Sequence, residues 1–124
     1  MLILDANVWI AALNLDDSQH LKAEIIFKGI QEKVLVPECI LIEILNVLVL
    51  RVNKGVADQF LKMVFDSSNV EVWPSSEELL RVLCSFFLKN PYKKLSFPDQ
   101  ALVYFSKQHK VLTFDKALAK HLPQ

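Results

Sequence analysis

The chain has 124 residues, 52% of them hydrophobic, and its 14 basic side chains balance its 14 acidic ones. This length fits one domain over residues 1–124, and the apolar fraction excludes a disordered chain. With only two glycines, an all-β sandwich rich in tight turns is also disfavoured. Zero net charge argues at first sight against a nucleic-acid partner, because nucleic-acid-binding domains are usually basic.

The two cysteines, Cys39 and Cys84, lie in apolar runs and match neither a disulfide framework nor a zinc pattern. They indicate buried reduced thiols in a cytoplasmic protein. The first residues lack the basic region of a signal peptide. The longest apolar stretch, over 39–50, is interrupted by polar residues and is shorter than the roughly 20 residues of a membrane helix. We therefore expect a soluble cytoplasmic protein.

Short apolar runs alternate with helical patterns from the start of the chain. Residues 1–4 predict a buried strand that ends at Asp5, and residues 7–13 predict a short helix. Ser18 is the predicted N-cap of a helix over 19–31. The apolar stripe of that helix is predicted to consist of Leu21, Ile25, Ile26 and Ile30.

The middle of the chain repeats this alternation. A second strand over 33–36 stops at Pro37, which suits the start of a helix over 38–52. A further helix is predicted over 54–65. Its inward face is predicted to consist of Val56, Phe60, Met63 and Val64.

The last third of the chain completes the pattern. The predicted elements are a strand over 70–73, a helix over 77–88, a loop over 90–95, a helix over 98–109, a strand over 111–114 and a helix over 115–121. Strands separated by helices imply a parallel sheet with helices on both faces. The predicted fold class is therefore a three-layer α/β/α domain with a mostly parallel sheet of about four strands.

Three aspartates stand near the ends of predicted strands or the start of a helix. Asp5 ends the first strand, Asp115 follows the fourth, and Asp99 lies in the first turn of a helix. The functional crevice of an open parallel sheet lies beyond the carboxyl ends of its strands, so these side chains point to one edge. Each aspartate also has a simpler interpretation as the cap of a helix.

Glu43 lies within the most apolar predicted helix, with no Lys or Arg three or four residues away. An unpaired ionised carboxylate on a buried face costs several kcal/mol or takes up a proton. A cation shared with Asp5, Asp99 and Asp115 would offset all four charges. We therefore predict that these four acids are catalytic residues and ligands of Mg²⁺ or Mn²⁺, which prefer oxygen ligands and bridge to phosphates. The implied reaction is metal-assisted hydrolysis of a phosphodiester.

Four segments, in this order, resemble the motifs of PIN domains. Residues 2–10 resemble the opening strand with its acid, and 37–48 the helix bearing the second acid. Residues 95–102 resemble the segment with the third acid, and 111–115 the strand that ends in a Thr-x-Asp element. The size is similar to that of VapC-type toxins, the ribonuclease half of prokaryotic toxin–antitoxin pairs. The resemblance implies a Mg²⁺- or Mn²⁺-dependent endoribonuclease that cleaves RNA, forms a homodimer and is inhibited by a small antitoxin protein.

The resemblance also implies roles for single residues. Asp5, Glu43, Asp99 and Asp115 correspond to the metal-site acids, with Asn7 and Thr113 as polar supports. Two positions depart from the pattern. Gln100 stands where many relatives have Ala, and Trp9 is bulky for a place near the site, which suits a core aromatic instead.

One loop and two helical segments also have compositions that suit binding. Tyr92, Lys93 and Lys94 suit RNA phosphates and a stacked base, although solvated loops often have the same composition. The segments 47–50 and 54–65 are a candidate surface for a dimer or an antitoxin, with core packing as the other interpretation. The histidines are expected at solvent-facing or terminal positions, with no catalytic role: His20, His109 and His121.

The sequence is compatible with two other functions. A PIN-like domain that binds RNA or protein without cutting is one, although a complete set of four acids argues against it. A receiver-type phosphoacceptor needs an Asp after the third strand, where this chain has Trp73 and Pro74. If the four acids bind metal, 10 other acidic groups remain against 14 basic ones, so the surface that RNA meets is mildly basic.

Overall fold

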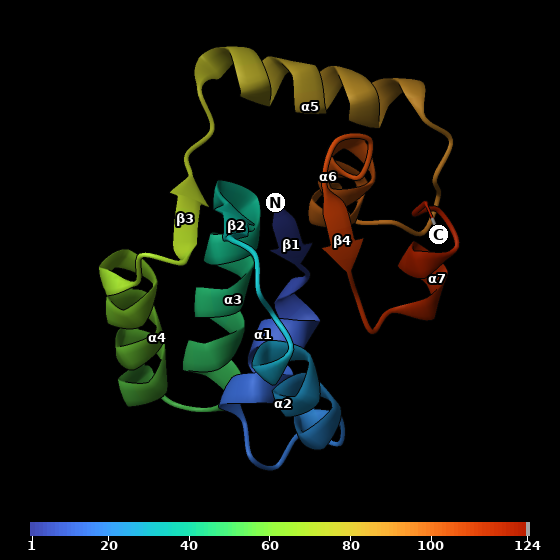
Figure 1. Cartoon of the computed structure of the whole chain (residues 1–124). Helices are drawn as coiled ribbons and strands as arrows, with labels where there is room; N and C mark the ends of the chain where they lie inside the picture. The colour runs from blue at the N-terminus through green and yellow to red at the C-terminus, as the bar shows by residue number, and fades with distance from the viewer. Residues whose placement is uncertain (124) are drawn as a thin grey trace.

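A four-stranded parallel sheet forms the middle layer of the protein (Figure 1). The computed structural model describes residues 1–123. The elements, in chain order, are β1 (Leu2–Leu4), α1 (Ala6–Leu13), α2 (His20–Lys28), β2 (Val34–Pro37), α3 (Glu38–Arg51), α4 (Lys54–Asp66), β3 (Val70–Trp73), α5 (Glu77–Lys89), α6 (Phe97–Phe105), β4 (Lys110–Leu112) and α7 (Lys116–Ala119). The predicted order of strands and helices and the α/β/α fold class are confirmed.

The order of the strands explains why helices cover both faces of the sheet. The strands lie in the order β3-β2-β1-β4, and each neighbouring pair is parallel. The chain moves from β1 to β2 to β3 in one direction and then returns across the sheet to β4. Because parallel crossovers are right-handed, this reversal places α1 to α4 on one face and α5 and α6 on the other. In Figure 1, α5 runs above the strands, whereas α1, α2 and α4 lie below them.

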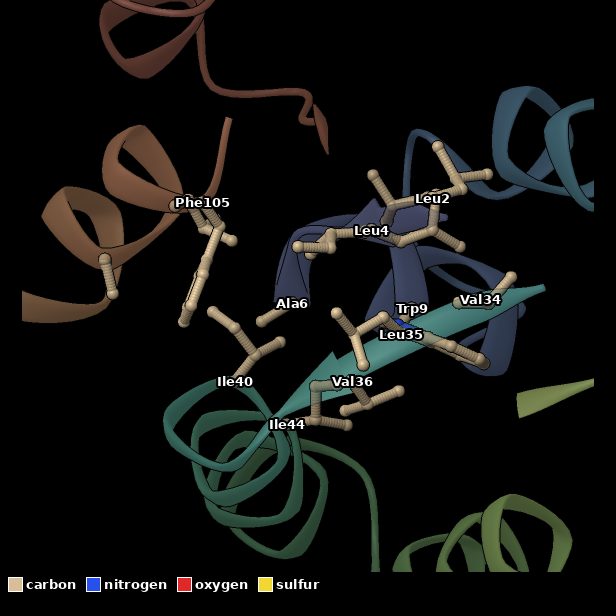
Figure 2. Close-up of a cluster of buried hydrophobic side chains, with 14 of the residues drawn as sticks. Leu2, Leu4, Ala6, Trp9, Val34, Leu35, Val36, Ile40, Ile44 and Phe105 are labelled. Carbon is tan, nitrogen blue, oxygen red and sulfur yellow. The ribbon is translucent and has the colours of Figure 1, made fainter. Parts of the chain in front are cut away.

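The hydrophobic core forms around the two central strands. The side chains of β1 and β2 are buried along both strands, and Figure 2 shows them close to Ile40 and Ile44 of α3 and to Phe105 of α6. Trp9 of α1 packs edge-on against Phe27 and Phe60, with ring centroids 4.9 and 5.3 Å away. Trp9 is therefore a core aromatic.

Helix α2 is shorter than predicted and turned about its axis. Its N-cap is Gln19 rather than Ser18, and no side chain caps it. Of the predicted apolar stripe, Leu21 and Ile25 are 73% and 72% exposed, while the other two members are only partly buried. The predicted stripe was therefore wrong in its first and second members, Leu21 and Ile25.

The buried side of α2 consists of His20 and Ala23. The prediction that His20 faces solvent was wrong. Its Nδ1 lies 2.7 Å from the backbone oxygen of Ala11, and its Nε2 lies 3.1 Å from Glu24 Oε1. Because both ring nitrogens have partners, this polar ring is buried without an unsatisfied group.

Further differences concern single side chains. Met63 of α4 is exposed rather than inward, and Ala57 is buried on the inner face instead. Cys39 is partly buried, whereas Cys84 is exposed, so the prediction of two buried thiols fails for Cys84. Burial raises the pKa of the Cys39 thiol to about 11.

The elements near the end of the chain are shorter than predicted. Strand β4 stops at Leu112 rather than residue 114, because its partner β1 ends at Leu4, opposite Leu112. Helix α6 ends at Phe105 and α7 at Ala119. Within the part of the chain that the structure describes, no helix combines the length and the hydropathy needed to cross a bilayer.

The core assignment predicts a difference between two phenylalanines of α4. Phe60 is 1% exposed and Phe65 is 65% exposed. We expect Phe60→Ala to lower the free energy of unfolding by about 3–5 kcal/mol, since it leaves a cavity beside Trp9. Phe65→Ala, the matched control, should cost less than about 1 kcal/mol. Urea denaturation followed by circular dichroism measures both, and equal losses would contradict the assignment.

Candidate active site

The carboxyl ends of β1 and β4 lie side by side where the strand order reverses. After β1 the chain crosses one face of the sheet to reach β2. It reaches β4 from β3 across the opposite face. In open α/β sheets, ligands bind in the crevice at such a point. Asp5 directly follows β1, and Thr113 and Asp115 follow β4. The topology therefore brings these residues to the expected place for a site.

Asp5 is a buried carboxylate, 5% exposed. Its Oδ1 accepts a hydrogen bond from the backbone N–H of Ala6 at 2.7 Å, and its Oδ2 accepts one from the Thr113 hydroxyl at 2.6 Å. Burial raises the pKa of Asp5, the two hydrogen bonds lower it in part, and the nearby Asp99 and Asp115 carboxylates raise it further. An ionised Asp5 is therefore favoured by any positive charge that approaches it.

The Thr113 hydroxyl connects the ends of the two strands. Besides donating to Asp5, it accepts hydrogen bonds from Asn7 Nδ2 at 3.2 Å and from the backbone N–H of Asp115 at 3.0 Å. A hydroxyl has one donor and two acceptor positions, so all three are used. Asn7 Oδ1 in turn accepts from the backbone N–H of Phe114 at 3.2 Å. Asn7 and Thr113 thus hold the β4–α7 turn against the start of α1.

All three aspartates also cap helices. Asp5 caps α1, and Asp115 Oδ1 accepts from two backbone N–H groups of α7 at 2.8 and 3.3 Å. Asp99 forms a capping box with Ser96, in which its Oδ2 accepts from the Ser96 N–H at 3.1 Å. The simpler interpretation as caps is therefore correct, and it leaves Asp99 Oδ1 and Asp115 Oδ2 outside these bonds.

Glu43 has no such local reason for its place. It is partly buried in the middle of α3, and within residues 1–123 its buried Oε2 finds no hydrogen-bond partner. Burial, followed by the charges of Asp5 and Asp99, raises the pKa of Glu43 to about 7. The carboxylate borders an open groove lined by Cys39, Ile42, Glu43, Asn46, Val47, Ser96 and Pro98.

The four predicted acids lie near one another without forming a finished ligand set. Asp5 is within electrostatic reach of Asp99 and Asp115, and Glu43 is within reach of Asp5 and Asp99. No group of three or more His, Cys, Asp or Glu side chains in residues 1–123 is arranged to hold a metal ion. The unpartnered oxygen of Glu43 and the remaining oxygens of Asp99 and Asp115 are nevertheless the donors that a hard cation takes.

The loop before α6 contains the predicted RNA-binding residues. Lys93 and Lys94 are exposed. Tyr92 is partly buried, and its ring centroid lies 4.7 Å from that of His121. The tyrosine ring thus packs against the end of the described chain, while the two ammonium groups extend into solvent.

Gln100 anchors this loop, a role that the sequence did not reveal. It is 3% exposed, and its Nε2 donates to the backbone oxygens of Leu95 at 3.1 Å and Tyr92 at 3.4 Å. Its departure from the pattern that the family resemblance implies was the available signal. The buried amide fixes the loop against the helix that carries Asp99.

Comparisons with known proteins agree with this architecture. The family model described as PIN domain matches residues 2–121. No curated protein matches the sequence. Among solved structures, the fold is similar to the crystal structure of VapC20 of Mycobacterium tuberculosis, described as a sarcin–ricin loop cleaving toxin. That match has a TM-score of 0.84 and 18% sequence identity, and covers 97% of this chain and 94% of the other.

The environment of Glu43 predicts a pH-dependent stability. Its pKa of about 7 exceeds the ordinary 4.5, so the folded state retains a proton that the unfolded state releases. Stability is therefore lost as pH rises from about 4.5 to about 7, and the full cost persists above that window. Glu43→Gln should raise the melting temperature at pH 8 in EDTA, and this gain should disappear near pH 4.5.

Glu78→Gln is the matched control, because Glu78 is exposed on α5. Its melting temperature should follow that of the unaltered protein at every pH. Differential scanning fluorimetry between pH 4.5 and pH 8 measures these melting temperatures. A gain in Glu43→Gln that is the same at every pH would contradict the predicted pH dependence.

Proposed function

We propose that this chain, which belongs to the PIN domain family, is an endoribonuclease that hydrolyses RNA phosphodiester bonds with a bound Mg²⁺ or Mn²⁺ ion. The family match over residues 2–121 confirms the family predicted from four sequence motifs. The observation that carries the proposal is the gathering of acids around buried Asp5 at the reversal of the strand order. We propose that residues 1–124 act as one domain.

The four acids contribute to the cation site in different ways. When bound, the cation supplies a water of lowered pKa and offsets charge on the phosphate. Asp5 provides the rigid contact, because the Ala6 N–H and the Thr113 hydroxyl fix both of its oxygens. Asp99 and Asp115 offer their remaining oxygens from the first turn of α6 and from the N-cap of α7. Glu43 gains a partner for its buried Oε2 when positive charge is present.

We further propose that the chain is the toxin component of a type II toxin–antitoxin system. The similar fold of VapC20, described as a toxin that cleaves the sarcin–ricin loop, supports this assignment. RNA is then the substrate, the cytoplasm the place of action, and a small antitoxin protein the inhibitor. Val49 and Leu50 of α3 and Phe65 of α4 are exposed, which supports pairing with a second copy, whereas Phe60 belongs to the core.

A non-catalytic PIN-like domain that binds RNA or protein is the second candidate. One observation favours it, namely that the four carboxylates do not form a ready-made cation site within residues 1–123. Titration calorimetry with Mn²⁺ separates the two candidates. Measurable binding that is lost in Asp99→Asn supports the nuclease, and no binding supports the second candidate.

The proposal predicts RNA cleavage that needs a divalent cation. With Mg²⁺ or Mn²⁺, the purified chain should cut single-stranded RNA, and Asp5→Asn or Asp99→Asn should slow cleavage by about 100-fold or more. Asp58→Asn is the control, because Asp58 is a surface acid paired with Lys54 on α4. Gel assays of labelled RNA measure the rates, and full activity in EDTA would contradict the proposal.

The toxin assignment predicts an effect on growth. Expression of the chain in bacteria should arrest growth, and co-expression of the small protein encoded beside it should relieve the arrest. Asp5→Asn should be harmless at the same expression level, because it removes a charge from the acid cluster. Growth curves with matched immunoblots measure this, and equal toxicity of Asp5→Asn would refute the assignment.

A further inference from the structure

We propose that Lys22 and Phe114 form a subsite for an RNA phosphate beside the acid cluster, next to the phosphate that is cut. The inference rests on the proposed ribonuclease function and extends it to the binding of the RNA strand. Lys22 lies on α2, outside the segments that resemble family motifs, whereas Phe114 is the middle residue of the Thr-x-Asp element in the β4–α7 turn.

The first observation is the position of the Lys22 ammonium group. Its Nζ lies 5.2 Å from the centroid of the Phe114 ring. A cation within about 6 Å of an aromatic centroid is attracted to the face of the ring. The Lys22 residue is exposed, and none of the ion pairs found among residues 1–123 includes it. The ring therefore fixes the side chain of Lys22, while the ammonium group stays available to a ligand.

The second observation is that Phe114 is fixed to the candidate active site. Its backbone N–H donates to Asn7 Oδ1 at 3.2 Å. It lies between Thr113, which donates to Asp5, and Asp115, which caps α7. The position of the Lys22 charge is thus tied to the same hydrogen-bond network that holds Asp5 and Asp115.

The charges around the site explain why a lysine is useful there. The four acids attract a cation, and this cation binds the phosphate to be cut. The same acids repel the neighbouring phosphates of the strand. A lysine is a compact positive charge with three donors and binds phosphate oxygens without regard to the base. Lys93 and Lys94 precede α6 in one helical layer, whereas Lys22 belongs to α2 in the other. An RNA strand that crosses the crevice is therefore met by positive charge from both layers.

The salt dependence of RNA binding tests the subsite. Each phosphate contact to a single strand contributes about 0.7 to the slope of log K against log salt concentration. In an Asp99→Asn background without added divalent cation, Lys22→Gln should reduce the magnitude of that slope by about 0.7, which corresponds to about fivefold weaker binding at 0.1 M salt. Fluorescence anisotropy of a labelled single-stranded RNA of mixed sequence measures both quantities.

Lys28→Gln is the matched control, because Lys28 is exposed on the same helix. It should leave the slope unchanged, and Lys22→Arg should retain it. An unchanged slope in Lys22→Gln, or an equal change in Lys28→Gln, would overturn the inference while the proposed function stands if the unaltered protein still cuts RNA. If that protein neither binds nor cuts RNA, both fail together.

A second variant tests whether Phe114 positions the lysine. Phe114→Leu keeps an apolar side chain but removes the ring face, so binding should weaken when Lys22 is present. In the Lys22→Gln background the same change should have little effect, because the ring then has no cation to hold. Losses that add fully in the double variant would overturn the role of Phe114.

Discussion

The hydroxyl of Thr113 is the contact on which the site depends. It donates to Asp5 and accepts from the Asn7 amide and the Asp115 backbone N–H, so its three hydrogen-bonding positions are all used. Without it, the carboxylate of Asp5 would be buried with one donor fewer, which costs about 1–3 kcal/mol for a buried polar group. The ionisation of Asp5, the pairing of β1 with β4 and the start of α7 are thus coupled through one oxygen atom.

The acids show how a cluster of carboxylates arises from ordinary rules of helix formation. Asp5, Asp99 and Asp115 each stabilise the start of a helix, and parallel α/β topology brings all three helix starts toward one edge of the sheet. In Asp99 and Asp115, capping uses only one of the two carboxylate oxygens. Glu43 differs, because its place in α3 costs stability in the absence of a counter-charge. Its unfavourable burial is the clearest physical sign of a function.

The sequence predicted most of the fold because strand and helix periodicities alternate clearly and Pro37, Pro74 and Pro98 mark boundaries. It failed on the orientation of α2, since a count of apolar side chains could not foresee that His20 is buried by two polar partners. It also predicted β4 as too long, because the length of a strand depends on where its partner ends. The acids could be named from their positions, whereas Gln100 and Lys22 depend on packing between distant segments.

The bond between Thr113 and Asp5 joins residues 108 positions apart in the sequence. A ribosome releases the chain from its N-terminus, so β1 emerges before the other strands, whereas its neighbour β4 is made after all of them. Until then, Asp5 lacks the hydroxyl that fixes it and Asp115 has not been made. The timing of synthesis therefore keeps the acid cluster incomplete on a growing chain. The acid cluster of a chain built this way is complete only after all four strands have been synthesised.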